Sequence, residues 1–139
     1  MKRALIVVAA VAMALATLAP VAGASPQSFR GDWSAVDLSD GSNLSLSISP
    51  RRQLPNGQTT EAPVRKAFVS IADDSSPACG GGGVSGVGEG DPTGSQMTVT
   101  FTLRCDGAAS SFGTATVTFF SYQGTLTDSV HAGSVWYRS

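Results

Sequence analysis

Histidine and cysteine are scarce in this chain of 139 residues, which contains one histidine, His131, and two cysteines. Zinc sites take three or four protein ligands, drawn mostly from these residue types. The acidic residues Asp73 and Asp74, and Glu89 with Asp91, match no known calcium-ligand spacing. We interpret them as solvated turn carboxylates and expect no bound metal.

Charged side chains are also few, at 14% of the chain. Lys2 and Arg3 lie in the N-terminal 24 residues, so the remainder has seven basic and ten acidic residues and a net charge of −3. A nucleic-acid surface needs clustered cations against the phosphates. The seven basic residues are scattered and include only two adjacent pairs, which excludes nucleic acid as a partner; they are Arg30, Arg51, Arg52, Arg65, Lys66, Arg104 and Arg138.

Long apolar runs are absent after residue 24. Before it, Lys2 and Arg3 precede an apolar run that ends at Leu18, and small residues follow at Ala22 and Ala24. This pattern is typical of a secretory signal peptide over residues 1–24. The run is also shorter than the roughly eighteen residues of a spanning helix. We therefore expect residues 25–139 to be secreted, into the periplasm or the extracellular medium, with no membrane insertion after signal cleavage.

Segments rich in strong helix formers are sparse, whereas Ser and Thr make up 30 of the 115 residues after the predicted signal. Apolar residues alternate with polar ones, most clearly at 44–48 and 97–105, as in strands with one buried face. Residues 25–139 are predicted to form a single all-β domain, an antiparallel up-and-down β-barrel of seven to eight strands, with a β-sandwich as the alternative. The predicted inward residues are Trp33, Leu44, Leu46, Ile48, Val69, Ile71, Met97, Val99, Phe101, Leu103, Val117, Phe119 and Trp136.

Both cysteines follow the predicted signal, and an even number in an exported protein predicts a disulfide between Cys79 and Cys105. Residues 91–94 have the composition of a hairpin turn, and the two cysteines are at mirror positions about Pro92. Opposed positions of a hairpin have Cβ atoms about 4.5–5.5 Å apart, which a disulfide bridges with slight adjustment. Closing this loop should stabilise the fold by roughly 3.5 kcal/mol.

The two ends of the predicted domain carry a pattern with a known structural use. Gly31 and Trp33 form a Gly-x-Trp near the start, and Arg138 lies near the end. This combination resembles the signature of calycins, the superfamily of lipocalins and avidins. The resemblance implies a barrel closed where Arg138 covers the Trp33 indole, in a cation–π contact of roughly 0.5–2 kcal/mol. Trp136 should share the inward face of Arg138, because residues two apart on a strand point the same way. The whole pattern also resembles small secreted bacterial proteins.

Two patterns that could indicate an enzyme are weak. Residues 80–90 contain a nominal Gly-x-Gly-x-x-Gly, but no predicted helix follows to bind a pyrophosphate. We interpret these glycines as relief of crowding inside a curved strand. His131 follows Asp128 by three residues, yet residues 83–87 miss the nucleophile-elbow pattern at the last position. We interpret His131 as a solvated loop residue and expect no catalytic residue, no enzyme activity and no cofactor.

A binding role therefore remains, in two versions. The preferred version is a non-catalytic protein whose barrel mouth holds a small apolar or amphipathic ligand, since a glycine-rich strand removes side chains from one wall. The alternative is a protein-binding module, such as an extracellular protease inhibitor or a cell-envelope interaction domain, acting through residues 51–63 or an edge strand. An enclosed apolar void of at least about 300 Å³ favours the first version, and a filled interior favours the second.

Overall fold

The computed structural model describes residues 29–53, 56, 58–61 and 66–139. The predicted signal peptide, residues 1–24, lies outside the described residues. So does part of the segment 51–63 that the protein-binding alternative invokes.

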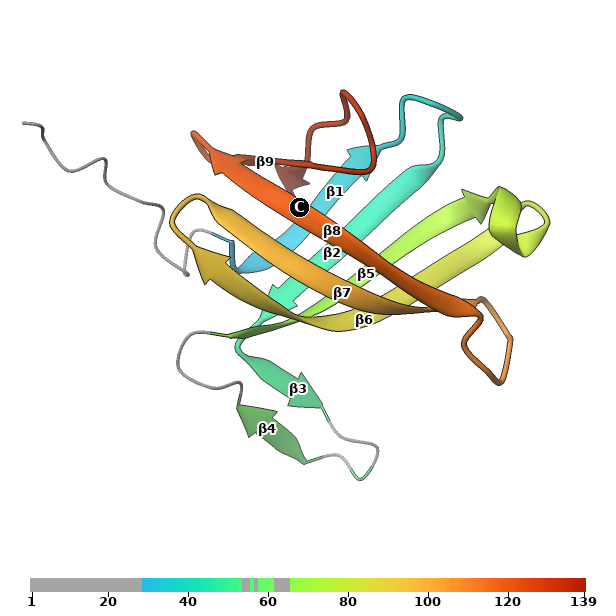
Figure 1. Ribbon diagram of the computed structural model, residues 1–139, viewed down its shortest axis with the longest axis horizontal. Helices are drawn as coiled ribbons and strands as arrows, with labels where there is room; N and C mark the ends of the chain where they lie inside the picture. The colour runs from blue at the N-terminus through green and yellow to red at the C-terminus, as the bar shows by residue number, and fades with distance from the viewer. Residues whose placement is uncertain (1–28, 54–55, 57, 62–65) are drawn as a thin grey trace, which may run out of the picture.

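The described strands form one antiparallel sheet of eight, in the order β10-β1-β2-β5-β6-β7-β8-β9, and a separate hairpin of β3 and β4 (Figure 1). Apart from that hairpin, strands adjacent in the sequence are neighbours in the sheet, which is up-and-down topology. The strands of the sheet are β1 (Gly31–Val36), β2 (Asn43–Ser49), β5 (Ala67–Ser76), β6 (Gly82–Thr93), β7 (Gln96–Cys105), β8 (Gly113–Tyr122), β9 (Thr125–Asp128) and β10 (Tyr137–Arg138).

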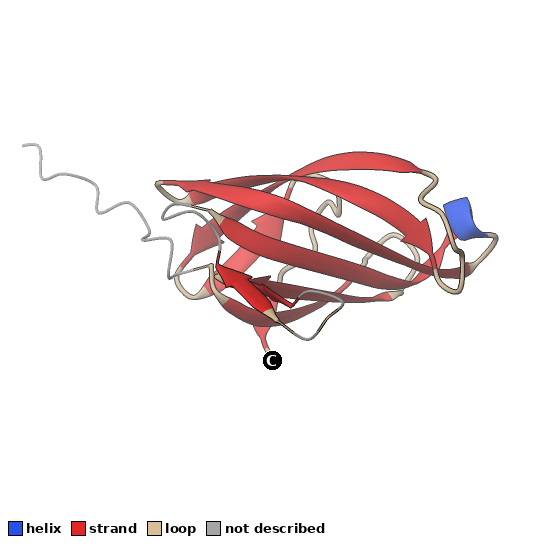
Figure 2. Ribbon diagram, turned by 90° about the horizontal axis from the view of Figure 1, so that it is seen from below, coloured by secondary structure: helices blue, strands red, loops and turns tan. Residues whose placement is uncertain are grey.

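The two edge strands of this sheet meet and nearly close it into a barrel (Figure 2). Leu126 of β9 and Trp136, just before β10, exchange two backbone hydrogen bonds, with N···O distances of 3.1 and 2.8 Å. On its other side, β10 pairs with β1, where Trp33 lies opposite Arg138. The predicted all-β barrel is confirmed. The strands form a single wrapped sheet rather than the two stacked sheets of a β-sandwich.

The interior is apolar and follows the alternation of the sequence. Every residue predicted to face inward is buried in the core or, for Ile71 and Leu103, packed against it. Threonines occupy the outer face of β7 and β8, where the Thr98–Thr118 and Thr100–Thr116 hydroxyl pairs are 3.1 and 3.0 Å apart. The core residues that the sequence interpretation missed are Phe29, Ala35, Ala67 and Leu126.

The Cys79–Cys105 disulfide is present, but the hairpin register predicted for it is wrong. The β6–β7 turn is at residues 94–95, not 91–94, so Val84 rather than Cys79 pairs with Cys105. Pro92 lies within the ladder opposite Met97, and Gly94 supplies the positive φ of the turn. Cys79 belongs to the short 3₁₀ helix η2 (Pro77–Cys79) between β5 and β6, where its Cα lies 5.5 Å from that of Cys105.

The remaining strands, β3 (Arg51–Gln53) and β4 (Thr59–Glu61), pair with each other antiparallel and belong to no other sheet. They project from the barrel wall between β2 and β5 (Figure 1). The interior of the barrel is therefore built without them.

Candidate functional site

Trp33, Phe29 and Arg138 fill and cover one end of the barrel, which we call the closed end. The Trp33 side chain is 1% exposed, and its Nε1 donates to the Phe29 carbonyl oxygen at 2.9 Å. The Arg138 guanidinium carbon lies 4.5 Å from the centroid of the Trp33 ring, and Nη1 donates to the Arg30 carbonyl oxygen at 2.7 Å. This is the cation–π geometry that the calycin resemblance implies.

Gly31 is required at the closed end for two reasons. Its φ of +124° is one that residues with a side chain rarely adopt. A Cβ on Gly31 would also lie 2.8 Å from Arg138 Nη1. Any side chain there would strain the backbone and displace the guanidinium from the Trp33 ring.

Trp136 is fully buried, and as the residue two before Arg138 it projects to the same face of the sheet. That face is the inward one, because Arg138 lies directly opposite inward-pointing Trp33. The Trp136 ring lies edge-on to Phe119 and to His131, with centroids 6.1 and 6.3 Å away. Trp136 therefore stabilises the seam between β9 and β10, whereas Arg138 covers Trp33 at the closed end.

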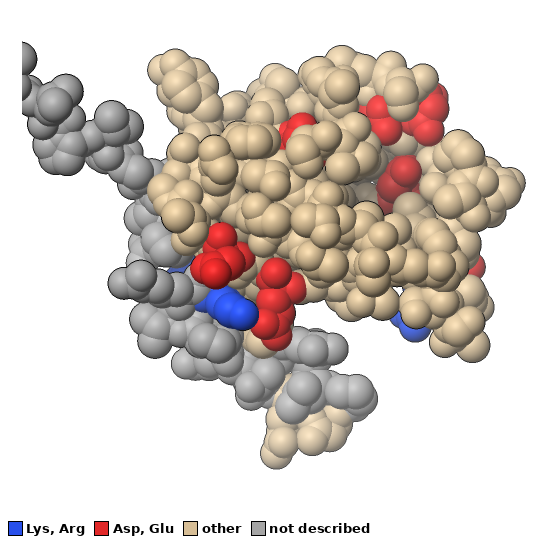
Figure 3. Space-filling model, viewed as in Figure 1, with Lys and Arg blue, Asp and Glu red and all other residues tan. Residues whose placement is uncertain are grey.

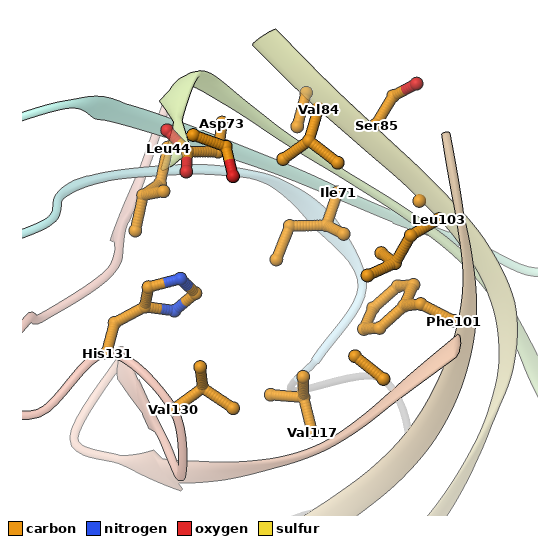
Figure 4. A pocket seen from close by; sticks show the side chains of 14 residues that line it. Leu44, Ile71, Asp73, Val84, Ser85, Phe101, Leu103, Val117, Val130 and His131 are labelled. Atoms are coloured by element: carbon orange, nitrogen blue, oxygen red, sulfur yellow. The ribbon is translucent and has the colours of Figure 1, made fainter. Parts of the chain in front are cut away.

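The opposite half of the barrel is hollow. A cavity of about 220 Å³, which we call the pocket, lies near the disulfide, because Val84 of its lining pairs with Cys105. Figure 4 shows the side chains that line it. Its wall is mainly aliphatic, with Phe101 as its aromatic member and a few polar groups near the mouth. The lining residues are Leu44, Ile71, Ala72, Asp73, Ser76, Val84, Ser85, Gly86, Phe101, Leu103, Ala115, Val117, Val130 and His131.

His131 is held at the pocket by a buried carboxylate. Its Nδ1 lies 3.0–3.1 Å from the two carboxylate oxygens of Asp128. The same carboxylate accepts a hydrogen bond from Trp136 Nε1 at 2.8 Å. The side chain of Asp128 is 0% exposed and that of His131 only 14% exposed. The imidazole is therefore fixed in position by its Nδ1 edge.

The local sequence explains how this geometry forms. Asp128 ends β9, and its Oδ1 accepts hydrogen bonds from the backbone N–H groups of Val130 and His131, both at 2.7 Å. Such Asx turns let an aspartate close a tight loop with its own side chain. Ser134 N then donates to the His131 carbonyl oxygen at 3.0 Å, and Gly133 has a φ of +83°. The loop returns directly to Trp136.

The electrostatics of this cluster favour a charged pair. Burial raises the pKa of Asp128, but hydrogen bonds from His131, Trp136 and Val130 outweigh it and lower that pKa to about 2. The hydrogen bond to Asp128 raises the pKa of His131 above its usual value, opposed by burial and aided by the charges of Asp128, Asp37 and Asp73. Asp128 accepts, so Nδ1 of His131 carries a proton.

The interpretation of His131 as a solvated loop residue is therefore wrong. Its three-residue spacing from Asp128 was visible in the sequence, and it is the signal that pointed to this pair. The position of Trp136 over that pair was not visible, because it depends on the closing of β10 onto β9. Asp73, interpreted as a solvated turn carboxylate, lines the pocket and also accepts a hydrogen bond from Ser75 N at 3.1 Å.

The glycine-rich pattern and the near match to a nucleophile elbow do not have the structure that either site requires. Residues 83–87 lie inside β6 rather than on a strand-to-helix turn. The Ser85 hydroxyl points away from His131 (Figure 4). A Cβ on Gly88 would lie 2.4 Å from the Thr100 carbonyl oxygen, and one on Gly90 would lie 2.5 Å from Met97 Sδ. These glycines let neighbouring side chains fill the interior, as the crowding interpretation predicts.

Neither a metal-binding cluster nor a membrane-spanning helix is found in the part of the chain that the structure describes. It contains no group of three or more His, Cys, Asp or Glu residues placed to hold a metal ion. Within the same residues, no helix is long and apolar enough to cross a membrane. On the face shown in Figure 3, the Lys and Arg side chains that are drawn in colour are few and separated.

The fold and the pocket define an antiparallel, nearly closed β-barrel with one filled and one hollow end. Its shape is consistent with that of calycins. Comparison with protein families, curated proteins and solved structures found no match to this chain.

Proposed function

We propose that this chain is a secreted, non-catalytic binding protein that holds a small apolar or amphipathic ligand in the pocket. The observation that supports it most is the pocket itself, a mainly aliphatic cavity at the end of the barrel opposite Phe29 and Trp33. Ligand sites are concave and mostly apolar, with a few placed polar groups. The pocket has this composition, with His131 and Asp73 as two of its polar groups.

The volume of the pocket limits the size of the ligand. At about 220 Å³ it is smaller than the void of roughly 300 Å³ that we expected of a barrel with a small-molecule ligand, so this expectation is not met. It exceeds the roughly 150 Å³ apolar cavity that binds benzene in an engineered protein. The fitting ligand is therefore a single ring or a short chain, smaller than the lipids and pigments that fill wide barrels.

Export is part of the proposal. The Cys79–Cys105 disulfide is compatible with an oxidising compartment outside the cytoplasm. The predicted signal peptide supports the same location, and an exported barrel would meet its ligand in the periplasm or the medium.

A protein partner is the second candidate, favoured by the β3–β4 hairpin. This hairpin lies outside the barrel and contributes nothing to its wall. Exposed hairpins of this kind can dock on a protein by backbone pairing, as an extracellular protease inhibitor or a cell-envelope interaction domain would do.

A methyl-detected NMR titration with toluene separates the two candidates. Toluene should shift the methyl signals of Ile71, Val84, Leu103 and Val117, which line the pocket. Val84→Trp should abolish these shifts by filling the pocket. The matched control is Val87→Trp on the same strand, where the side chain is 56% exposed, and it should leave them intact. Unshifted pocket methyls in the folded wild-type protein would exclude the small-ligand function and leave the hairpin as the candidate.

A further inference from the structure

The pocket is lined by two ionisable side chains, His131 and Asp73. The His131 ring, from the loop after β9, points into the cavity, and Asp73 of β5 lies across from it (Figure 4). Among the described residues, no hydrogen bond or ion pair joins these two side chains. Both line the pocket, so a polar ligand atom placed between them would contact both.

In each of the two side chains, one polar atom already makes a hydrogen bond within the described part of the protein and the other does not. Nδ1 of His131 is bound to Asp128, so Nε2 is the ring nitrogen left for the pocket. Oδ1 of Asp73 accepts from Ser75 N at 3.1 Å, and we assign the other oxygen, Oδ2, to the ligand. The mouth thus combines a nitrogen that donates when the ring is protonated with an oxygen that only accepts.

We propose that the pocket selects a small neutral hydroxyl compound, a phenol or short alcohol, whose oxygen lies between His131 Nε2 and Asp73 Oδ2. The inference rests on the proposed function and specifies its ligand. A hydroxyl group accepts one hydrogen bond and donates another, so it satisfies both atoms at once. The hydrocarbon part of the ligand would then contact Ile71, Leu103 and Val117.

Charged head groups fit this arrangement less well. A carboxylate would pair with protonated His131, but it would also face Asp73 and lie near the buried charge of Asp128, and two like charges oppose this one attraction. An ammonium group would pair with Asp73, but it has no acceptor and would place its donors against the imidazole N–H. A neutral hydrocarbon would leave both polar atoms of the mouth without a ligand partner.

Four probes of nearly equal size test this inference: p-cresol, toluene, benzylamine and 4-methylbenzoate. With the wild-type protein near pH 6, p-cresol should bind roughly fivefold to tenfold more tightly than toluene, the gain of about one net hydrogen bond. Benzylamine and 4-methylbenzoate should bind more weakly than p-cresol. In addition, p-cresol but not toluene should shift the ¹⁵N resonance of His131 Nε2, a readout that needs no mutation.

Asp73→Asn identifies the acceptor. Because Ser75 N holds the Oδ1 position, the substitution turns an NH₂ donor toward the pocket where a carboxylate oxygen was. The p-cresol preference over toluene should fall to about onefold, while toluene binding is unchanged. The control is Asp91→Asn, an exposed carboxylate on β6 far from the pocket lining, which should keep the preference.

The outcomes separate this inference from the proposed function. Equal affinity for p-cresol and toluene would overturn the hydroxyl ligand and leave the pocket as a purely apolar site. Tightest binding by benzylamine or 4-methylbenzoate would overturn it in favour of a charged ligand. Failure of all four probes to shift the pocket methyls would overturn the proposed function as well.

Discussion

The two ends of this barrel are built from the same strands, yet one is solid and the other is hollow. At the closed end, Phe29 and Trp33 fill the interior and Arg138 covers it. Toward the open end the inward side chains are Leu44, Ile71, Val84 and Leu103, which line the wall without meeting across it. The sheet therefore does not determine where a ligand can enter. The distribution of large aromatic side chains along the strands does.

The glycines of β6 permit close packing at both ends. At Gly88 and Gly90, Val99, Met97 and the β7 backbone occupy the space that a Cβ would need. At Gly86, which lines the pocket, a Cβ would lie 2.9 Å from Leu103 and 3.1 Å from Ile71, so neighbouring side chains occupy that space too. The cavity therefore does not arise from the absence of a side chain at Gly86.

The largest expected effect comes from emptying the closed end. Trp33→Ala should lower the free energy of unfolding by about 3–5 kcal/mol, since a fully buried aromatic residue is lost. Val84→Ala at the open end should cost only about 1 kcal/mol, because its side chain already borders a cavity. Urea unfolding of both variants measures the difference. Equal losses would mean that the two ends are packed alike.

The disulfide beside the open end should contribute nearly as much to the free energy of unfolding as Trp33 does. In the chain-entropy treatment, closing a loop with a sequence separation of 26 stabilises the fold by about 3.5 kcal/mol. Replacing both Cys79 and Cys105 by Ala should remove that amount in urea unfolding. Detection of two free thiols in the exported, unreduced protein would contradict the bond itself.

The next effect concerns the polar cluster at the pocket. Asp128→Asn should destabilise the protein by about 2–3 kcal/mol, because the carboxylate accepts from His131, Trp136 and the loop backbone. Asp106→Asn is the exposed control and should change stability little. In the wild type, the folded pKa of about 2 is below the usual 3.8, so this stabilisation is present above pH 3.8 and lost as the pH falls toward 2.

The smallest expected effect is the dependence of the protein's stability on pH that His131 causes. Its pKa is raised above 6.5 in the folded state, chiefly by Asp128, so its stabilising contribution is complete below pH 6.5 and is lost as the pH rises through the folded pKa. Titration of the His131 ring by NMR measures that pKa. Asp128→Asn should lower it, and an unchanged value would show that the pair is not coupled.

The sequence predicted the wall of this barrel better than its contents. Strict alternation in β2 and β7 identified the inward residues, because burial of one face imposes a period of two. The cavity depends on how far opposite walls stand apart, which no local pattern encodes. His131 shows the limit clearly. Its pairing with Asp128 is local, but its burial depends on Trp136, which the barrel closure brings over the loop.

The turn between β6 and β7 shows a second limit. Two turn signals overlap there, Asp91-Pro92 and Gly94-Ser95, and the hairpin forms at the second. The predicted disulfide was still correct, because η2 carries Cys79 to Cys105 from outside the ladder. A correct pair of residues can thus follow from a wrong register.

A crystal structure of the protein under xenon pressure distinguishes a hollow end of the barrel from a solid one. Xenon enters empty apolar cavities and avoids packed interiors. We expect a xenon atom among Phe101, Leu103 and Val117, and none between Trp33 and Met97. Absence of xenon from the pocket, or its presence at the closed end, would contradict the difference between the two ends.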